Sequence, residues 1–288
     1  MRLALGTAQF GMAYGINNSV GQVSQNQIHN IIKFARLNKI QTIDTAISYG
    51  VSELALGSED LSSFKIITKL PSVPNNCRNL KDWVLKELQS SLQRLNVRSI
   101  YGILIHDTSQ LYGKFGFELI QALVFVKSIG LVEKIGISVY DPIDFDTLYY
   151  FYNFELVQCP FNLIDRRLIQ TGWLRKLKDR NVEVHTRSCF LQGLLIMNKQ
   201  NIPNKFNKWN GLWELWHEWL DLNSVSAVHA CLNYVASFSE IDNIIVGVDT
   251  LQQLEEISKF FKSKGLDGFP DISCDDHNLI NPSKWRKL

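Results

Sequence analysis

Short runs of apolar and β-branched residues alternate along the chain with longer stretches in which apolar residues recur every three or four positions. The short runs are apolar almost throughout, which is typical of parallel strands that helices cover on both faces. The longer stretches have the period of amphipathic α-helices. Eight runs predict strands: RLALGT (2–7), QTIDTA (41–46), FKIITK (64–69), IYGILIH (100–106), EKIGISV (133–139), ELVQCP (155–160), VEVHTR (182–187) and NIIVGV (243–248).

The stretches between these runs predict helices. In the first, Ser24 followed by Gln27 indicates a capping box at a helix N-terminus. Apolar residues fall on one helix face in four of these stretches: the first stretch, the stretch before the fourth run, the stretch after the fourth run and the stretch after the eighth run. These faces consist of Ile28, Ile31, Ile32 and Ala35; of Trp83, Leu85, Leu88, Leu92 and Leu95; of Leu119, Leu123, Val126 and Ile129; and of Leu251, Leu254, Ile257 and Phe261.

Eight strand-then-helix units predict an α/β fold, a closed (β/α)8 TIM barrel in which residues 1–288 form a single domain. An open doubly wound sheet is the alternative, but no GxGxxG motif follows the first run. Two stretches fall outside the repeat. Residues 189–225 predict a long loop after strand seven with an aromatic-rich helix, and the tail SCDDHNLINPSKWRKL has no periodic pattern and is expected to be irregular. Long loops around a barrel mouth commonly shape substrate pockets.

Composition and charge exclude several classes of protein. The 288 residues carry a net charge of +2 without a basic stripe, so no nucleic-acid partner is expected. The five cysteines form no CxxC pair, which predicts neither a disulfide framework nor a metal site and is typical of a cytoplasmic protein. No apolar run of about 18 residues is present, and the apolar part of MRLALGTAQFG is too short for a signal peptide, so no membrane segment is expected.

Four polar side chains are expected at one end of the barrel, where the C-terminal ends of the strands meet. Asp44 and Tyr49 follow strand two, Lys69 ends strand three and His106 ends strand four. A free tyrosine, with a pKa of about 10, is a poor acid near neutrality, but a nearby ammonium stabilises its phenolate and a carboxylate keeps that ammonium charged. Such a phenol can protonate a carbonyl oxygen while a hydride reaches the carbon. Each residue alone has an ordinary structural interpretation, whereas the four together predict a reductase site.

The chain resembles the aldo-keto reductase superfamily over nearly its whole length. The resemblance rests on the segments LGTAQFG, DTAISYGVSELALG, ITKL, LIHD, KIGISV, QCPFNLIDRR and VGVDTLQQLEE. It implies a barrel that binds a nicotinamide cofactor without a Rossmann domain and reduces an aldehyde or ketone. It also implies that Tyr49 is the general acid, that Lys69 and Asp44 tune it, and that His106 orients the carbonyl.

The resemblance implies a set of cofactor contacts as well. Ser138 and Gln158 match residues that hold the nicotinamide carboxamide, although Val139 stands where the family often has Asn. Arg187 stands where the family usually has an aromatic side chain stacked on the nicotinamide ring. The full set is Gly6, Thr7, Ser138, Gln158 and Arg187; Gln192, Gly193 and Leu194 in a loop across the pyrophosphate; and Gly247, Val248, Asp249, Gln253 and Glu256 around the adenosine phosphate.

The resemblance allows either NADPH or NADH, and the residues favour NADH. After Gly247 a helix is expected whose N-terminal amides could meet a phosphate. The positions that match the family's 2′-phosphate site carry no Lys or Arg, and Asp249 would repel a 2′-phosphate or accept a hydrogen bond from a 2′-hydroxyl. Lys259 or Lys262 could supply a cation from the last helix.

The substrate is expected to be a small carbonyl compound. The segments LGTAQFGMAYGI and NLINPSKW resemble a bacterial branch found among surface-polysaccharide genes, which implies carbohydrate metabolism and a sugar or nucleotide-sugar carbonyl. Arg166 and Arg167 are interpreted either as helix caps or as contacts to a substrate phosphate. An alternative function is a catalytically weak nicotinamide-binding barrel that serves as a sensor or partner subunit. The sequence predicts no oligomeric state.

Overall fold

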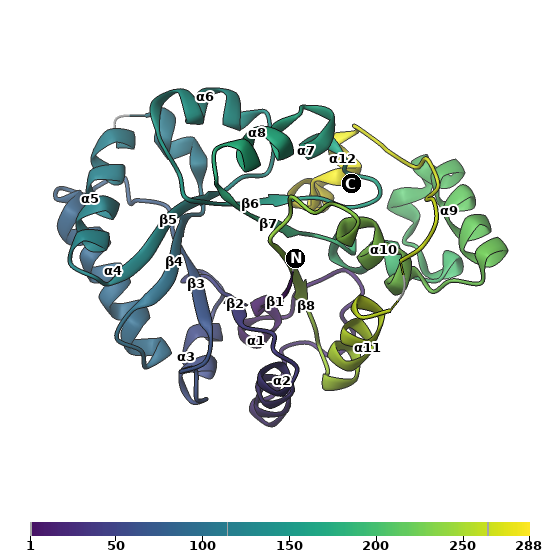
Figure 1. The fold of residues 1–288 in the computed structure, drawn as a ribbon, viewed down its shortest axis with the longest axis horizontal. Helices are drawn as coiled ribbons and strands as arrows, with labels where there is room; N and C mark the ends of the chain where they lie inside the picture. Colours follow the sequence, from purple (N-terminus) through teal and green to yellow (C-terminus); the bar gives the residue numbers. More distant parts are fainter. Residues whose placement is uncertain (1, 114, 264) are drawn as a thin grey trace.

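Eight parallel strands close into a barrel in the computed structural model, which describes residues 2–113, 115–263 and 265–288 (Figure 1). Neighbours in the barrel are neighbours in sequence, and β1 closes the sheet by pairing with β8, with Ala4 opposite Ile245. The predicted (β/α)8 barrel is therefore confirmed. The strands are β1 (Arg2–Gly6), β2 (Thr42–Asp44), β3 (Lys65–Leu70), β4 (Ile100–Ile105), β5 (Val132–Ser138), β6 (Leu156–Pro160), β7 (Glu183–Arg187) and β8 (Asn243–Gly247).

Helices surround the barrel, and Ser24 caps the first long one by accepting a hydrogen bond from the Gln27 amide at 3.5 Å. Within the described parts of the chain, no helix is both long and apolar enough to cross a membrane. The longer helices are α2 (Gln25–Leu37), α3 (Ser52–Gly57), α4 (Leu80–Leu95), α5 (Gly116–Ser128), α6 (Asp144–Phe151), α8 (Trp173–Asp179), α9 (Asn210–Asn223), α10 (Ala227–Ala236) and α11 (Leu251–Phe261); the short ones are α1 (Ala8–Gly11), α7 (Arg167–Gln170), α12 (His277–Ile280), η1 (Thr108–Tyr112), η2 (Leu191–Ile196), η3 (Lys199–Asn201), η4 (Asn204–Trp209) and η5 (Pro282–Lys287).

The apolar core has two parts. A large cluster lies between the strands and the helices, as expected for strands that are covered by helices. A small cluster of Ile67, Tyr101, Leu104 and Leu156 packs separately from it. A side chain at Gly136 would place its Cβ 2.0 Å from the Leu156 carbonyl oxygen, so glycine is required where β5 passes β6.

The segment after β7 is more regular than a loop. It forms η2, η3 and η4 and then α9, which lies at the edge of the molecule beyond α10 (Figure 1). Trp213 and Trp216 of α9 are buried, and their indole N–H groups donate to the carbonyls of Phe206 and Leu195 at 3.2 and 2.9 Å. Aromatic burial therefore anchors this helix.

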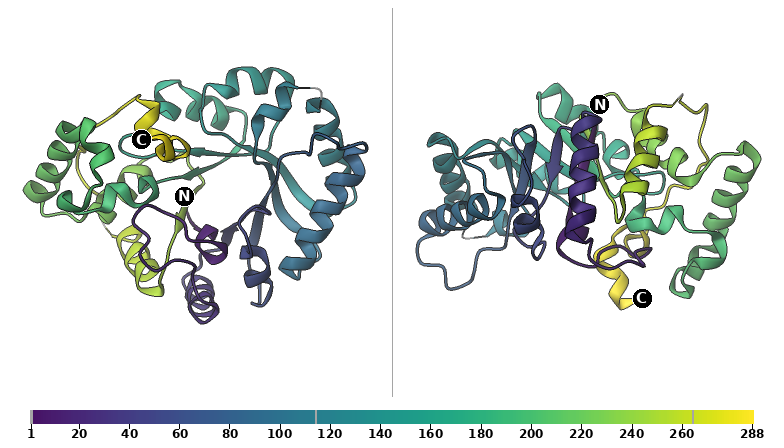
Figure 2. Two further views of the ribbon diagram at one scale, coloured as in Figure 1. Left: turned by 180° about the vertical axis from the view of Figure 1, so that it is seen from behind. Right: turned by 90° about the horizontal axis from the view of Figure 1, so that it is seen from below.

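The C-terminal tail contains two helical turns, α12 and η5, within its otherwise irregular course. Leu279, Ile280 and Trp285 are buried, and the Trp285 indole donates to the Leu279 carbonyl at 3.0 Å. The right view of Figure 2 shows this segment, in yellow, at the opposite end of the molecule from the N-terminus. The tail therefore packs at the end of the barrel where the strands finish.

A polar cluster crosses the barrel from the first half of β4, β5 and β7. Glu183 accepts hydrogen bonds from Tyr101 at 2.6 Å and from Lys134 at 2.7 Å, and His185 lies 2.7 Å from its other oxygen. Burial raises the pKa of the Glu183 carboxyl, but the hydrogen bonds from His185, Lys134 and Tyr101 outweigh burial and lower it. This cluster lies away from the C-terminal strand ends, where the active sites of such barrels lie, and its contacts join three strands of the barrel.

Candidate active site

A buried ion pair lies at the C-terminal ends of β2 and β3. The Lys69 ammonium is 2.6 Å from Asp44 Oδ1 and also donates to the Thr45 carbonyl at 2.9 Å, with the lysine fully buried. Burial lowers the pKa of Lys69, but the charges of Asp44 and Tyr49 outweigh burial and raise it. Lys69 therefore carries its positive charge at neutral pH.

Tyr49 faces this ion pair. The Lys69 ammonium lies 5.0 Å from the centroid of the Tyr49 ring. Two glycines allow the Tyr49 turn to lie close to α1: a Cβ at Gly11 would be 1.7 Å from the Tyr49 carbonyl oxygen, and Gly50 has a positive φ of 56° with a Cβ position 2.4 Å from the Gly11 oxygen. The glycines in QFGMAYG and SYGVSE thus fix the position of the phenol.

His106 also lies beside Tyr49. The two ring centroids are 6.0 Å apart in an edge arrangement, and the Ser48 hydroxyl is 3.2 Å from His106 Nδ1. Burial, followed by the positive charges of Lys69 and Arg187, lowers the pKa of His106 to about 4. The imidazole is therefore neutral near pH 7, and one ring nitrogen can donate a hydrogen bond.

A hydrogen-bond network fixes the second oxygen of Asp44. The Gln158 amide donates to Asp44 Oδ2 at 2.7 Å, and the Ser138 hydroxyl donates to the Gln158 carbonyl oxygen at 3.2 Å. All three side chains are buried. Both carboxylate oxygens of Asp44 therefore have a hydrogen-bond partner, which fixes the orientation of the carboxylate and with it the position of the Lys69 ammonium.

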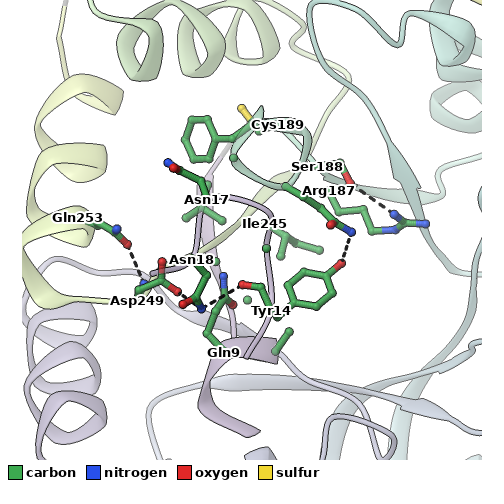
Figure 3. A pocket seen from close by; sticks show the side chains of 18 of the residues that line it. Gln9, Tyr14, Asn17, Asn18, Arg187, Ser188, Cys189, Ile245, Asp249 and Gln253 are labelled. Carbon is green, nitrogen blue, oxygen red and sulfur yellow. Dashed lines mark hydrogen bonds between the residues drawn. The ribbon is translucent and has the colours of Figure 1, made fainter. Parts of the chain in front are cut away.

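A cavity of about 380 Å³ opens beside this network (Figure 3). Asp44 and Tyr49 are part of its wall. Neither Lys69 nor His106 lines it, but both lie close to the Tyr49 ring. The cavity brings together most of the predicted cofactor positions, namely Gly6, Thr7, Gln158, Arg187, Gln192, Gly193, Gly247, Asp249, Gln253 and Glu256.

Three predicted cofactor positions do not line the cavity. Leu194, in η2, and Val248, directly after β8, are each 1% exposed, because their apolar side chains pack in the apolar core. Ser138 is 3% exposed and contacts Gln158. Side-chain contact between these three residues and a molecule in the cavity is therefore not supported.

A segment that sequence reasoning did not assign, residues 12–22, passes over the cavity and is called the strap (Figure 3). The Ile16 amide donates to the Gln192 carbonyl at 3.1 Å, and Asn18 donates to Asp249 at 3.0 Å. A Cβ at Gly193 would lie 2.6 Å from the Asn17 Cβ, so glycine is needed where the strap crosses. The available signal was the polar, turn-rich sequence YGINNSVGQ (14–22) between the first strand and the first long helix.

The first turn of α11 has its own side-chain caps. The Asp249 amide donates to the Gln253 side chain at 2.7 Å, the Leu251 amide to Gln27 at 3.3 Å, and the Gln253 amide to Thr250 at 3.3 Å. Three amides at this turn thus donate to side chains of the chain itself, and the expectation that the turn meets a phosphate stays a prediction.

The cations suggested for a phosphate lie elsewhere. Lys262 donates to Asn38 at 3.0 Å, and neither Lys259 nor Lys262 lines the cavity. Arg167 contacts Asp165 and Asp141 at 2.8 and 2.7 Å. A substrate-phosphate role for Arg166 and Arg167 is thus not supported, because Arg166 also contacts Leu163 and Pro270 carbonyls and neither lines the cavity.

Comparison with known proteins agrees with the barrel. The profile of the aldo/keto reductase family matches residues 2–267. No curated protein sequence matches the chain. An aldo-keto reductase from Bacillus halodurans, in its holo form, has a similar structure with a TM-score of 0.74 and 18% identity, covering 92% of this chain and 88% of that one. The glycerol dehydrogenase from Gluconobacter oxydans has a TM-score of 0.69 and 22% identity, with the same coverage of 92% and 88%.

Proposed function

The chain belongs to the aldo/keto reductase family of NAD(P)H-dependent oxidoreductases, and we propose that it reduces an aldehyde or ketone with Tyr49 as the general acid. One observation carries this proposal: the Lys69 ammonium, held 2.6 Å from Asp44, lies 5.0 Å from the ring of a tyrosine in the cavity wall. We also propose that residues 1–288 act as a single barrel domain.

The roles of the four residues follow from charge and position. Tyr49 gives its proton to the carbonyl oxygen, and Lys69 stabilises the phenolate that remains. Asp44 keeps the ammonium charged and oriented. The neutral His106 ring donates a hydrogen bond that orients the carbonyl oxygen. A dihydronicotinamide held in the cavity beside Tyr49 and Gln158 would supply the hydride, so that the carbonyl carbon would gain the electron pair and the oxygen would gain the Tyr49 proton.

The residues around the cavity fit an extended dinucleotide. In Figure 3 the wall of the cavity extends from Arg187 and Tyr14 on one side to Asp249 and Gln253 on the other. Next to Tyr49, the Gln158 amide supplies a hydrogen-bonding group, and at the far end Asp249 supplies an acceptor for a ribose hydroxyl. Gly193 and Gly247 leave the wall between these ends without side chains.

A sugar or nucleotide-sugar carbonyl is the proposed substrate, supported by the resemblance of the LGTAQFGMAYGI and NLINPSKW segments. The test is a panel of carbonyl compounds, including keto-sugars, followed by the loss of reduced-cofactor absorbance at saturating NADH and NADPH. Turnover of at least one carbonyl is expected. Tight NADH binding without turnover of any compound would contradict the reductase and favour a sensor or partner subunit.

NADH is expected to bind at least as tightly as NADPH. The 2′-phosphate carries close to two negative charges at neutral pH, Asp249 is negative, and Arg187 at the other end is the only Lys or Arg lining the cavity among the described residues. Gln253→Arg is expected to shift the preference towards NADPH, because a charge-assisted hydrogen bond contributes roughly 1.5–3 kcal/mol, or about ten-fold or more in affinity. Titration of both cofactors against protein fluorescence measures the ratio.

The matched control is Gln252→Arg, which places the same charge on the same helix at an exposed position that does not line the cavity. This variant should keep the cofactor ratio of the parent. Parent protein that binds NADPH about ten-fold more tightly than NADH would show that a cation outside the cavity wall completes a 2′-phosphate site.

A further inference from the structure

Arg187 is a cation without a counter-charge beside the proposed reaction centre. Other buried cations have carboxylate partners: Lys69 is 2.6 Å from Asp44, and Arg167 is 2.8 Å from Asp165. Arg187 ends β7 and lines the cavity, yet within the described chain no carboxylate lies within 4.0 Å of its guanidinium nitrogens. A half-buried charge of this kind acts strongly on any charge that enters the cavity.

Neutral groups hold Arg187 in place. Its Nη2 donates to the Val139 carbonyl at 3.1 Å, its Nη1 to the Ser188 hydroxyl at 3.4 Å, and its guanidinium carbon lies 4.5 Å from the centroid of the Tyr140 ring. None of these partners reduces the net charge. Val139 itself is buried, so its carbonyl rather than its side chain contributes to the site.

Asp44, Asp107 next to His106 and Asp141 next to Tyr140 are each engaged by other groups. Asp44 is held by Lys69 and by the Gln158 amide. Asp107 accepts hydrogen bonds from Ser72 and Ser109, at 3.0 and 2.6 Å. The third, Asp141, pairs with Arg167 at 2.7 Å. The positive charge of Arg187 is therefore left for a molecule in the cavity to experience.

The electrostatic field of Arg187 reaches the proposed reaction centre, as its effects on two neighbouring side chains show. After burial and Lys69, Arg187 is the next contributor to the lowered pKa of His106, whose ring is 6.0 Å from that of Tyr49. The Arg187 charge also acts to lower the pKa of Tyr14, although burial and the charge of Tyr49 raise it overall. A nicotinamide close enough to transfer hydride to a carbonyl on Tyr49 lies within this same small volume.

We propose that Arg187 makes the cavity discriminate between the two redox states of the nicotinamide, favouring the neutral reduced ring over the cationic oxidised ring. The proposal rests on the proposed function. The rest of the dinucleotide is identical in both states, so they differ at the ring, and only the oxidised ring carries a positive charge. An aromatic side chain at this position would act in the opposite direction, because the face of an aromatic ring attracts cations. Arg187 thereby favours the binding of the reduced cofactor and the release of the oxidised one, while its charge opposes the formation of the cationic ring on the enzyme.

The test is the ratio of the dissociation constants of NAD⁺ and NADH, measured by quenching of tryptophan fluorescence. Arg187→Met should lower this ratio by about ten-fold, as expected for two unit charges several ångströms apart in a partly solvated site. Arg187→Lys keeps the charge without the planar group and should keep most of the ratio. Each ratio is internal to one variant, so a change in folded fraction affects both constants equally.

Arg180→Met is the matched control, because Arg180 lies 5.2 Å from the centroid of the Tyr149 ring and does not line the cavity. Its ratio should equal that of the parent. Weakening of both nucleotides by the same factor in Arg187→Met would overturn the proposal and assign Arg187 a packing role. The proposal would also be overturned if Arg187→Lys lowered the ratio of the NAD⁺ and NADH dissociation constants as much as Arg187→Met does. Parent protein that binds neither nucleotide would instead overturn the proposed function itself.

Discussion

Tyr49→Phe is expected to lower kcat for carbonyl reduction by about 10²–10⁴-fold and to leave the affinity for NADH nearly unchanged. The substitution removes only the phenolic oxygen from a ring whose position is set by the Gly11 and Gly50 turns. Its proton is needed in the transition state, so the loss falls on turnover rather than on binding. Steady-state kinetics and a fluorescence titration with NADH measure the two quantities.

Two further tyrosine variants make this test specific. Tyr14 also lines the cavity, but burial raises the pKa of its phenol, which accepts a hydrogen bond from Gln192 at 3.0 Å. A loss with Tyr14→Phe that exceeds the loss with Tyr49→Phe would assign the proton to Tyr14. Tyr149→Phe is the control away from the cavity. Tyr149 is buried and its hydroxyl donates a long hydrogen bond of 3.4 Å to the Phe154 carbonyl, so this substitution should leave activity unchanged.

The barrel could be predicted because its pattern repeats. Each of the eight runs is long enough to show whether both faces are apolar, and the helices between them carry one clear apolar face. The segment after β7 was harder to interpret, because 3₁₀ turns such as η3 and η4 have no apolar period of their own. Trp213 and Trp216 hold it in place through contacts made only in the folded chain.

The site was only partly predictable for a different reason. Strand ends converge in any such barrel, so Asp44, Tyr49 and Lys69 could be brought together from sequence alone. The sequence does not show which donor meets which acceptor. The amides at the start of α11 are satisfied by side chains from Gln27 and Gln253, and this competition depends on distances between separate elements.

Lys69→Met is expected to reduce activity by about 10²-fold or more, because Tyr49 loses the cation that stabilises its phenolate. The substitution also leaves the buried Asp44 carboxylate with the Gln158 amide but without its counter-ion. Breaking a buried pair from one side costs about 3–5 kcal/mol, so the free energy of unfolding should fall by this order. Activity assays and chemical denaturation measure the two effects.

Stability and chemistry can be separated with one further substitution. In Asp44→Asn/Lys69→Met no buried charge is stranded, so much of the lost stability should return while activity stays low. Recovery of activity together with stability would show that Lys69 acts through folding alone. Lys134→Met is the matched control: it breaks an ion pair 2.7 Å long with Glu183, away from the cavity, and should leave turnover unchanged.

The pH profile of the residual activity gives the final distinction. His106 has a pKa of about 4 and stays neutral above that pH, so it contributes no limb in the neutral or basic range. The basic limb then reports loss of the proton that the reduction consumes. Without the ammonium at Lys69 the phenolate is less stable, so the phenol keeps its proton longer and the limb should move to higher pH in Lys69→Met. An unmoved limb in a folded, measurably active variant would mean that the ammonium does not act on the general acid.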